Sequence, residues 1–382
     1  MLSERALLKN ILLATKDGDW GKSDPADGLV RYHVIRGTDF QSVAEGDSST
    51  VPVRYLSETT AARRTLESND ILIETAGGSR DRPTGRTMLV TESVLSGFDG
   101  PATCASFARF LRVDPEIADP RFVYWFLQFL YRSGQIEQYQ VQHTGVARFQ
   151  YTQFAANQEV PILPMRDQGA IADVLGALDD KIAANCRLAK TIDDLIYATY
   201  LSGIRGNPGR EVVVEDVVER VAIPRRMSPD EVASSGDFPV FDQGASVLLG
   251  YASGGGYIGA DTISPVLYFG DHTCRLGFCI RNFAVGPNTI PFRPVGVPAL
   301  ALYMALRGVQ RSEEYKRHWK SLLSKRIFLP SDSWSEDFCS KWMPGILQKE
   351  SLHKEILTLS SVRDVLLMGI MSGRIRVRDV ES

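Results

Sequence analysis

The chain has 382 residues, of which 44% are apolar, enough to bury a core in each of the two or three domains that this length predicts. Its 43 Lys and Arg against 46 Asp and Glu give a formal net charge of −3. This balance excludes the overall basic excess of a chain that binds nucleic acid unaided. The N-terminal segment has no apolar core of signal-peptide length, and no apolar run is long enough for a transmembrane helix. We therefore expect a cytoplasmic protein.

The sequence lacks the usual motifs for metals, cofactors and catalysis. Its five cysteines form no Cys-x-x-Cys pair and its five histidines are scattered, so we expect reduced thiols and no metal site. There is no Walker motif, no Gly-x-Ser-x-Gly elbow, no dinucleotide-binding Gly-x-Gly-x-x-Gly and no [ND]PP[YF] tetrapeptide of amino-methyltransferases. We therefore expect no catalytic residues in this chain.

The first predicted domain covers residues 1–163. Short β-type runs at 70–73 and 86–90 are separated by glycine-rich turns, and an aromatic helical stretch follows at 122–131. The turns carry arginines, whose guanidinium groups suit both phosphate and the guanine edge in the major groove. The alternative is a solvated loop in which the arginines pair with Asp81 and Glu74. The candidate binding residues of this domain are Arg36, Ser79, Arg80, Arg82, Arg86, Thr144 and Arg148.

A long helix is predicted over residues 164–206. Apolar residues recur there at alternating intervals of four and three, the period of a coiled-coil seam. Asn185 on this seam either sets the register or reaches solvent at an exposed helix end. Gly203 predicts the end of the helix, and the glycines and proline that follow predict a linker. The seam residues expected to form the spacer or a partner interface are Leu175, Leu178, Ile182, Ile192 and Ile196.

The second predicted domain covers residues 207–340 and repeats the mixed composition of the first. Asp271 beside His272 permits a catalytic interpretation, but no nucleophile can be placed near them, and a polar turn held by Asp271 is the alternative. A basic stretch over 307–326 either favours a phosphate backbone through counterion release or forms a solvated face. The candidate binding residues of this domain are Gln243, Tyr257, His272, Thr273, Arg275, Lys316, Arg317 and Lys320.

A second helix of the same kind is predicted within residues 341–382. The segment 371–373 repeats the Ser-Gly ending of 201–203 at an offset of 170 residues, and at that offset Asp194 meets Asp364. An internal repeat explains these matches better than two unrelated helices with a common cap. The predicted plan is globule, helix, globule, helix, in which two antiparallel helices hold the globules at opposite ends of a rod. The seam residues of this helix are Leu352, Ile356, Leu359 and Leu366.

Several of these stretches resemble the specificity (S) subunit of type I restriction-modification systems, and together they cover nearly the whole chain. The most specific match is 160–164 (VPILP), followed by Gln168 and the run 171–182. The opening pattern at 34–40, the stretches 240–244 and 267–273, and the ending at 366–377 are also similar to the family. The chain departs from the family before the second helix, where residues 331–342 replace the usual Pro-x-x-x-Gln entry.

The resemblance implies an α+β fold, with two globular α/β target-recognition domains separated by two long antiparallel coiled-coil helices in a pseudo-twofold internal repeat. It implies a noncatalytic DNA-binding subunit that reads a bipartite double-stranded target, with a fixed unread gap set by the spacer. Two methyltransferase subunits would dock on the spacer, bring S-adenosylmethionine and flip the adenine. Restriction and translocase subunits would bring ATP and Mg, and no membrane is involved. The net charge then implies that the partners supply much of the phosphate contact.

Three other interpretations remain open from the sequence. The first is the specificity subunit of another multisubunit methylation or phage-defence system, whose spacer would look alike. The second is a helical scaffold that binds only proteins. The third is a stand-alone hydrolase that uses Asp271 and His272.

Overall fold

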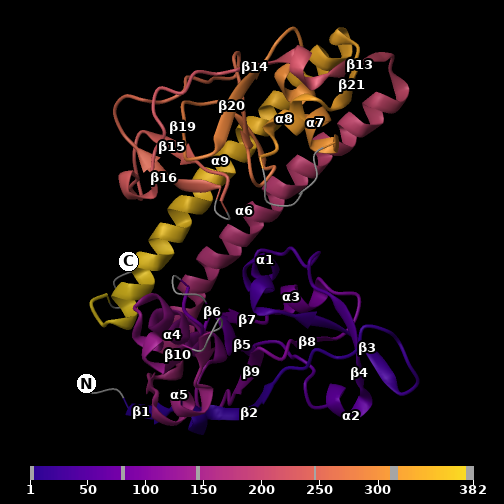
Figure 1. Cartoon of the computed structure of the whole chain (residues 1–382). Coiled ribbons are helices and arrows are strands. Elements are labelled where there is room, and N and C mark those ends of the chain that lie inside the picture. Colours follow the sequence, from indigo (N-terminus) through magenta and orange to yellow (C-terminus); the bar gives the residue numbers. More distant parts are fainter. Residues whose placement is uncertain (1–3, 79–81, 143–146, 245–246, 310–316, 376–382) are drawn as a thin grey trace. The chain divides into compact units, whose positions relative to one another are not determined.

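The computed structural model describes residues 4–78, 82–142, 147–244, 247–309 and 317–375. The chain divides into two compact units, each with one globule and about half of both long helices (Figure 1). Unit 1 comprises Met1–Ala189 and Ser351–Ser382, and unit 2 comprises Lys190–Glu350. Unit 1 therefore combines the first half of the chain with its C-terminal segment.

Unit 1 consists of short strands and helices that lead into the first long helix. Its strands are β1 (Glu4–Leu7), β2 (Leu12–Asp17), β3 (Leu29–Ile35), β4 (Val53–Ser57), β5 (Ile71–Glu74), β6 (Ala76–Gly78), β7 (Thr87–Leu89), β8 (Ala102–Cys104), β9 (Ala108–Val113), β10 (Gln140–Gln142), β11 (Ala147–Phe149) and β12 (Glu159–Ile162). Its α-helices are α1 (Phe40–Ala44), α2 (Glu58–Ala61), α3 (Glu92–Ser96), α4 (Pro120–Arg132), α5 (Tyr151–Asn157) and the long α6 (Met165–Gly206), which continues into unit 2. Three 3-10 turns, η1 (Leu8–Ile11), η2 (Gly37–Asp39) and η3 (Gln135–Tyr139), join them.

The strands of unit 1 form four small sheets. The central sheet has the order β2-β9-β5-β7 and is antiparallel, and all four residues of β5 are buried. A second sheet, β4-β3-β8, contains a parallel pair between β3 and β8. The sheets β1-β12 and β10-β11-β6 complete the unit. Because β1 pairs with β12, the beginning of the globule lies directly beside the strand that leads into α6.

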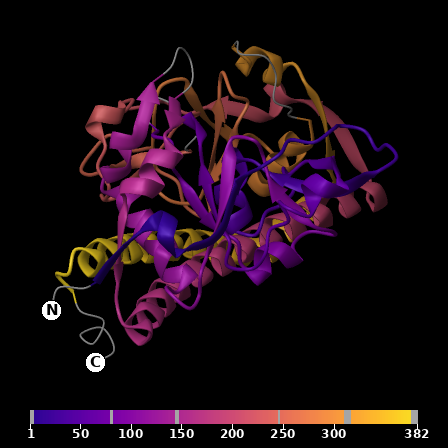
Figure 2. The same ribbon diagram turned by 90° about the horizontal axis from the view of Figure 1, so that it is seen from below.

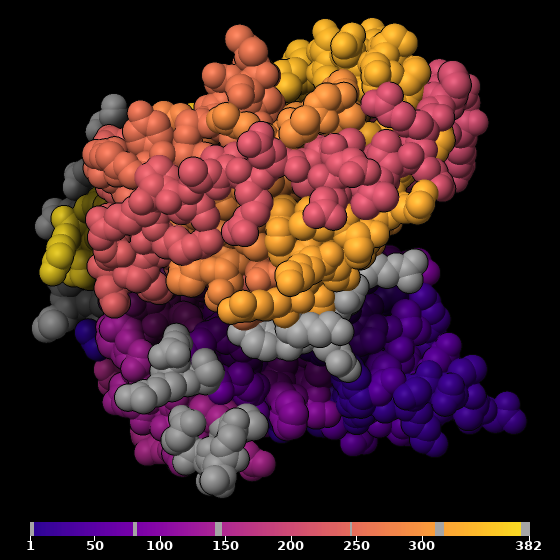
Figure 3. Space-filling view, turned by 45° about the horizontal axis from the view of Figure 1, so that its top comes forward, coloured from indigo at the N-terminus to yellow at the C-terminus, as the bar shows by residue number. Residues whose placement is uncertain are grey.

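Unit 2 consists of a similar series of elements. Its strands are β13 (Gly209–Val213), β14 (Val218–Arg220), β15 (Phe238–Phe241), β16 (Leu248–Ala252), β17 (Val266–Gly270), β18 (Leu276–Cys279), β19 (Ala284–Val285), β20 (Thr289–Pro294) and β21 (Arg326–Pro330). Its helical elements are η4 (Val214–Val217), η5 (Pro229–Glu231), α7 (Ala299–Val309), α8 (Trp319–Leu323) and the long α9 (Asp332–Met371), which continues into unit 1. In the space-filling view, rose-coloured segments from the start of this unit lie against orange segments from its end, as the β13–β21 pairing requires (Figure 3).

The strand pairing of unit 2 repeats that of unit 1. The sheet β14-β20-β17-β18 follows the order of β2-β9-β5-β7, and β16-β15-β19 follows β4-β3-β8, including the parallel pair. The pair β13-β21 likewise corresponds to β1-β12, and each is followed in the chain by a long helix. The β10-β11-β6 sheet is the feature of unit 1 that has no counterpart among the described strands of unit 2. The internal repeat predicted from the helices therefore extends to the topology of the globules.

In unit 1 the long helices α6 and α9 pack antiparallel (Figure 2). Arg363 on α9 donates to the carboxylate of Asp179 on α6 at 2.5 Å, and Lys181 pairs with Glu355 at 3.3 Å. Asn185 is only 2% exposed, so it lies on the seam rather than at a solvent-exposed end. A buried cluster joins both helices to α4 through Phe122, Trp125, Ile171, Ala172, Leu175, Leu367 and Ile370.

In unit 2 the remaining halves of the same helices are also antiparallel. Lys349 on α9 forms an ion pair with Asp193 on α6, and further along the ring of Phe338 packs at 5.7 Å from that of Tyr200. Both sides of this seam and the buried face of α7 belong to one large core, which includes Ile196, Tyr200, Leu300, Met304, Phe338 and Ile346.

The long helices compare differently with their predicted boundaries. α6 ends at Gly206, the predicted boundary, but the stop signal at Gly203 lies inside the helix. Gly203 packs against the ring of Trp334, where a side chain would clash. Gly373, its match in the repeat, does follow the end of α9 and has the left-handed φ of 74° typical of a helix C-cap. α9 begins at Asp332, nine residues before the expected boundary at 341.

Candidate nucleic-acid interface

In unit 1 the loops beside β5 are held by a buried ion pair. Glu74 at the end of β5 is 2% exposed, and Arg86 Nε and Nη2 donate to its carboxylate at 3.0 and 2.8 Å. Arg86 Nη2 also donates to the carbonyl of Gly37 at 2.7 Å, which ties the loop after β3 to β5. Glu74 raises the pKa of Arg86 against the opposing effect of burial. Arg86 is therefore paired with Glu74, as expected if the arginines of this loop pair within the protein instead of contacting DNA.

Arg36 is also bound within the protein. Its Nε and Nη2 donate to the carboxylate of Asp39, both at 2.8 Å, and Nη2 donates to the carbonyl of Thr50 at 2.7 Å. Burial acts to raise the pKa of Asp39, but hydrogen bonds from Arg36 and Thr50 outweigh it and lower the pKa. Arg36 thus holds the turn after β3 in place, and only part of its guanidinium faces solvent.

Arg82 and Arg148 are the exposed arginines among the first-domain candidates within the described ranges. Arg148 projects from β11, which pairs with β6 next to the turn that carries Arg82. Arg82 follows β6 in the chain and donates from Nη2 to the carbonyl of Gly77 at 3.2 Å, so the two arginines come from one strand of this small sheet and from the turn after another. Ser79, Arg80 and Thr144 lie outside the described residues.

In unit 2 the turn after β17 is held by two side chains. Gln243 Oε1 accepts a hydrogen bond from the backbone N–H of His272 at 2.9 Å. The buried carboxylate of Asp271 accepts from the backbone N–H groups of His318 at 3.0 Å and Trp319 at 2.8 Å. Asp271 therefore caps the beginning of α8 rather than orienting His272 for catalysis, and the polar-turn alternative describes this site.

The other candidates near this turn reach the surface to different degrees. His272, Thr273 and Arg275 are half-buried in the connection between β17 and β18. Tyr257 is 43% exposed, and its ring packs 5.4 Å from that of Phe238. These residues belong to the same unit but come from separate loops.

The basic stretch of unit 2 is only partly a free surface. Arg317 and Lys320 are exposed at the beginning of α8. Arg307 instead turns toward α6 and donates to Asp193 at 2.5 Å. Lys316 lies outside the described residues. Arg317, Lys320 and Arg326 are thus exposed cations of this stretch within the described ranges, and Arg326 lies 3.9 Å from Glu211.

The predicted seam residues pack within the long helices and the globules. The most buried are Leu175 and Ile196, followed by Leu352 and Ile182. The half-buried ones are Leu178, Ile192, Ile356, Leu359 and Leu366. These side chains therefore help to hold the two long helices together, and the half-buried ones keep part of their surface exposed.

The long helices also expose apolar side chains that the seam analysis did not identify. They are Met165, Leu188 and Leu195 on α6 and Leu347, Leu357, Val362, Val365 and Met368 on α9. Leu195 and Val365 occupy the same position of the repeat, 170 residues apart. Seam periodicity does not find them because they lie outside the seam positions, some beside the seam, as Leu188, Leu195 and Val362 do, and others farther around the helix. The repeat offset itself relates Leu195 to Val365.

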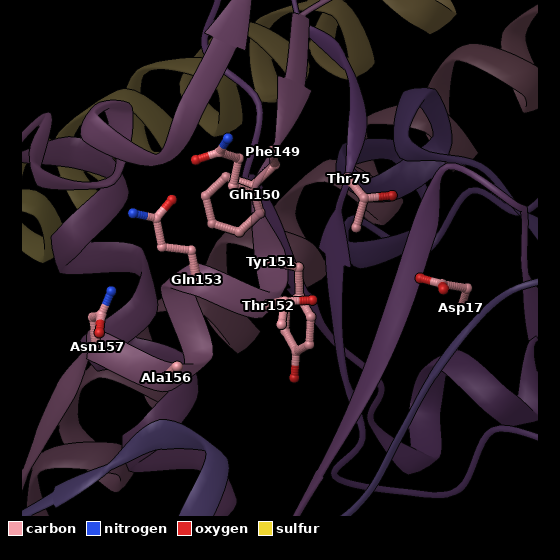
Figure 4. A pocket seen from close by; sticks show the side chains of 9 residues that line it. All are labelled: Asp17, Thr75, Phe149, Gln150, Tyr151, Thr152, Gln153, Ala156 and Asn157. Carbon is pink, nitrogen blue, oxygen red and sulfur yellow. The ribbon is translucent and has the colours of Figure 1, made fainter.

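A surface pocket of about 650 Å³ lies in unit 1 between α5 and the central sheet (Figure 4). Amide side chains of Gln150, Gln153 and Asn157 line one side, and Thr75 and Asp17 line the other. None of these residues is among the candidate binding residues predicted for the first domain. The signal that could have found them is the run of amides directly after Arg148.

No helix within the described ranges is long and apolar enough to cross a membrane. In the same parts of the chain, no three His, Cys, Asp or Glu side chains gather where they could hold a metal ion. No protein-family model and no curated protein matches the sequence.

Solved structures do resemble this chain. The S subunit of the type I restriction-modification system from M. genitalium is 14% identical and gives a TM-score of 0.55, with 96% of this chain and 95% of that chain covered. The HsdS subunit from Thermoanaerobacter tengcongensis is 14% identical over 98% and 97% of the two chains, with a TM-score of 0.37. A chain from a structure on complex assembly and conformational transition of the type I R-M system is 13% identical over 96% and 97%, with a TM-score of 0.36. The similarity to the first, together with the repeated globule-and-helix topology, gives this chain the fold of a type I restriction-modification S subunit.

Proposed function

We propose that this chain is the noncatalytic sequence-specificity subunit of a type I restriction-modification system. In this proposal each globule reads one half of a bipartite double-stranded DNA target. The proposal also places the two globules at opposite ends of an antiparallel coiled coil formed by α6 and α9. The observation that carries the proposal is the repeat of the strand order of three sheets, followed each time by a long helix.

The repeat supports bipartite reading for a geometric reason. Two copies of one binding fold, fixed on a rigid spacer, meet two sites at a constant distance, so the DNA between them is left unread. α6 has 42 residues, which at 1.5 Å per residue gives about 60 Å. This length corresponds to one to two turns of B-DNA, each about 34 Å.

The exposed apolar residues of the long helices are the proposed docking sites for methyltransferase subunits. Leu195 and Val365 are 53% and 65% exposed, although both are apolar. Their equivalence in the repeat suits two copies of one partner, one on each helix. Those subunits would bring S-adenosylmethionine and methylate adenine, and restriction subunits would bring ATP and Mg.

The candidate residues divide into two proposed roles. Side chains that tie one loop to another through hydrogen bonds are assigned to positioning the loops, and the others are assigned to DNA contact. The proposed contacts are the exposed Arg82, Arg148, Tyr257, Arg317 and Lys320, with the half-buried His272, Thr273 and Arg275 of the turn after β17 beside them. The proposed positioning residues are Arg36, Arg86 and Gln243.

The proposal is tested by single-molecule methylome sequencing of the source organism with and without the gene. The expected result is the loss of one bipartite methylated motif. Unchanged methylation, or loss of an uninterrupted motif, contradicts it. Alanine variants then test single residues. Removal of a base-reading side chain should cost about 1–3 kcal/mol of discrimination at one position, whereas removal of a phosphate-binding one should weaken binding to all sequences.

A further inference from the structure

The pocket between α5 and the central sheet of unit 1 has a fixed, charge-balanced wall. Asp17 accepts from Arg109 Nε at 2.9 Å and from Nη2 at 2.7 Å, so its charge is paired. The Arg109 guanidinium lies 4.3 Å from the centre of the Tyr151 ring, and the Tyr151 hydroxyl is hydrogen bonded to Thr15 Oγ1 at 3.1 Å. This side of the pocket therefore offers neither a free cation nor an unpaired anion.

The opposite side of the pocket is lined by amides. The side chains of Gln150, Gln153 and Asn157 are exposed, and within the described parts of the chain no hydrogen bond engages any of the three amides. Figure 4 shows these side chains along α5 and the residue before it, with Tyr151 between them and Thr75. Each amide provides both donors and an acceptor.

This chemistry fits the edge of a base better than a phosphate. A phosphate requires cations, and none of the nine lining residues is a lysine or arginine. A base edge in the major groove is neutral and presents donors and acceptors side by side. Adenine in particular offers N6–H and N7, which an Asn or Gln side chain can bind in a bidentate manner.

We propose that unit 1 reads an adenine in its half of the DNA target through the amides of Gln153 and Gln150 in this pocket. The inference rests on the proposed function and names the specificity of one of its two recognition units. Gln150 follows the exposed Arg148 by two residues, so the amide pocket directly adjoins a proposed DNA contact. The hydrogen bond from Phe149 N–H to the carbonyl of Thr75, at 2.9 Å, fixes this strand end against the end of β5.

The corresponding position of unit 2 carries a different group. Gln153 lies six residues before Glu159, which pairs with Leu7 of β1, and Lys320 lies six residues before Arg326, which pairs with Val213 of β13. Both side chains are exposed. A lysine suits guanine O6 and N7 or a phosphate, but it cannot accept a hydrogen bond from adenine N6. The two half-sites are therefore read by different chemistry at equivalent places.

The test uses the full chain assembled with its methyltransferase partner and a DNA library randomised in both half-sites. The variants are Gln153→Ala and Gln150→Ala, with Gln138→Ala as a matched control, because Gln138 is an exposed amide of the same unit outside the pocket. We expect the pocket variants to lose adenine preference at one position of one half-site by about 5- to 150-fold. The other half-site and the control keep their preferences.

Three results overturn the inference. They are an unchanged preference in both pocket variants, an equal loss of binding on every sequence, and a loss at a position that was not adenine. If the wild-type assembly shows no bipartite preference at all, the proposed function itself fails, which separates the two failures. As a converse experiment, Gln153→Lys is expected to shift the preferred base at the same position from adenine toward guanine.

Discussion

The two units share one strand order but hold their central loops by different chemistry. In unit 1 the last residue of β5 is Glu74, whose buried ion pair with Arg86 fixes Gly37. In unit 2 the last residue of β17 is Gly270, where an added Cβ would lie 2.7 Å from the Cβ of Gln243. Here the neutral amide of Gln243 holds the turn instead, by accepting a hydrogen bond from the backbone N–H of His272. Topology is thus common to both units, whereas the groups that position the loops are particular to each.

The two long helices also use different groups at equivalent places, because equivalent positions of the repeat carry opposite charges. At the repeat offset of 170 residues, Asp179 matches Lys349 and Asp193 matches Arg363. Asp179 pairs with Arg363 in unit 1, and Asp193 pairs with Lys349 in unit 2, so α6 supplies the anion in both units. Equivalent contacts are kept, but an exact copy of either half of the repeat would place like charges together. The charges of α6 therefore complement those of α9, and two copies of the same helix would not pair in this way.

Among the variants that test this difference between the units, removal of the Glu74 carboxylate is expected to lower the free energy of unfolding most. Glu74→Ala leaves Arg86 partly buried without its anion, and we expect a loss of about 3–5 kcal/mol in the free energy of unfolding. Gln243→Ala removes one neutral hydrogen bond from the corresponding place in unit 2, and we expect a loss of about 0.5–1.5 kcal/mol. Urea unfolding followed by circular dichroism measures both values.

A double variant serves as the control for this prediction. Glu74→Ala combined with Arg86→Met removes both charges and retains much of the apolar stem, so it is expected to be more stable than Glu74→Ala alone. If Glu74→Ala and Gln243→Ala lower the free energy of unfolding equally, the buried charge of Glu74 does not distinguish how the two units hold their loops.

The charge pairs of the spacer are expected to differ in strength. Asp193 binds both Lys349 on α9 and Arg307 on α7, so Asp193→Ala removes the anion from Lys349 and the nearer anion from Arg307, which keeps Asp194 at 3.8 Å. We expect a cost of about 1.5–3 kcal/mol. Asp179→Ala should cost less, because Arg363 keeps Asp364 as a partner at 2.8 Å. Thermal and urea unfolding of the two variants give the comparison.

Exchange of the two charges separates ion pairing from packing. Asp179→Arg with Arg363→Asp restores an opposite-charge pair across the helices and is expected to be more stable than Asp179→Arg alone. If the exchanged pair is no better than the single variant, the orientation of the pair and not its charge determines stability at this seam.

The sequence predicts the spacer better than the loops, and the reason is physical. A helix that packs along its whole length repeats its buried positions, so Leu175 and Ile182 can be recognised from spacing alone, whereas the burial of Asn185 is decided only by the structure. The partners of Arg86 and Asp271 depend on which loops meet in space. Asp271 holds residues 47 positions away, a separation that carries no periodic signal.

Gly203 illustrates how a correct local signal can be overridden. Glycine and the residues after it are typical of a helix end, but the glycine serves the packing of Trp334, which lies in a different part of the chain. The amides at α5 are the opposite case. Taken singly in the sequence they predict no site, and only the pocket that they line in the folded chain brings them together. Local chemistry predicts elements, whereas sites require the fold.

Two glycines of α6 sharpen the comparison of its halves. At Gly203, in unit 2, an added methyl group would collide with the Trp334 ring, so Gly203→Ala should cost about 1–3 kcal/mol. At Gly176, in unit 1, an added Cβ meets no atom within 4 Å, so Gly176→Ala should stabilise by up to about 1 kcal/mol through helix propensity. Unfolding midpoints of the two variants should move in opposite directions. A stabilising Gly203→Ala would mean that Trp334 yields without loss.

The smallest expected effect is a pH dependence of opposite sign at the two spacer aspartates. Burial acts to raise the pKa of Asp193, but Lys349 and Arg307 outweigh it, so its pKa lies below the ordinary value of about 3.9. Burial raises the pKa of Asp179, and the attraction of Arg363 does not fully offset it. The two carboxyls therefore bind protons with different affinities in the folded chain.

The stabilising contribution of Asp193 is present above about pH 3.9 and is lost as the pH falls through its lowered pKa. That of Asp179 is complete below about pH 3.9 and is lost as the pH rises through its raised pKa. Comparison of the wild type with Asp193→Asn and with Asp179→Asn, each across about pH 3 to 7, cancels the titration of all other groups. On acidification the wild type should lose stability relative to Asp193→Asn and gain it relative to Asp179→Asn. Parallel curves for the two comparisons would show that Arg307 gives Asp193 no advantage over Asp179, and that the two halves of the spacer are electrostatically alike.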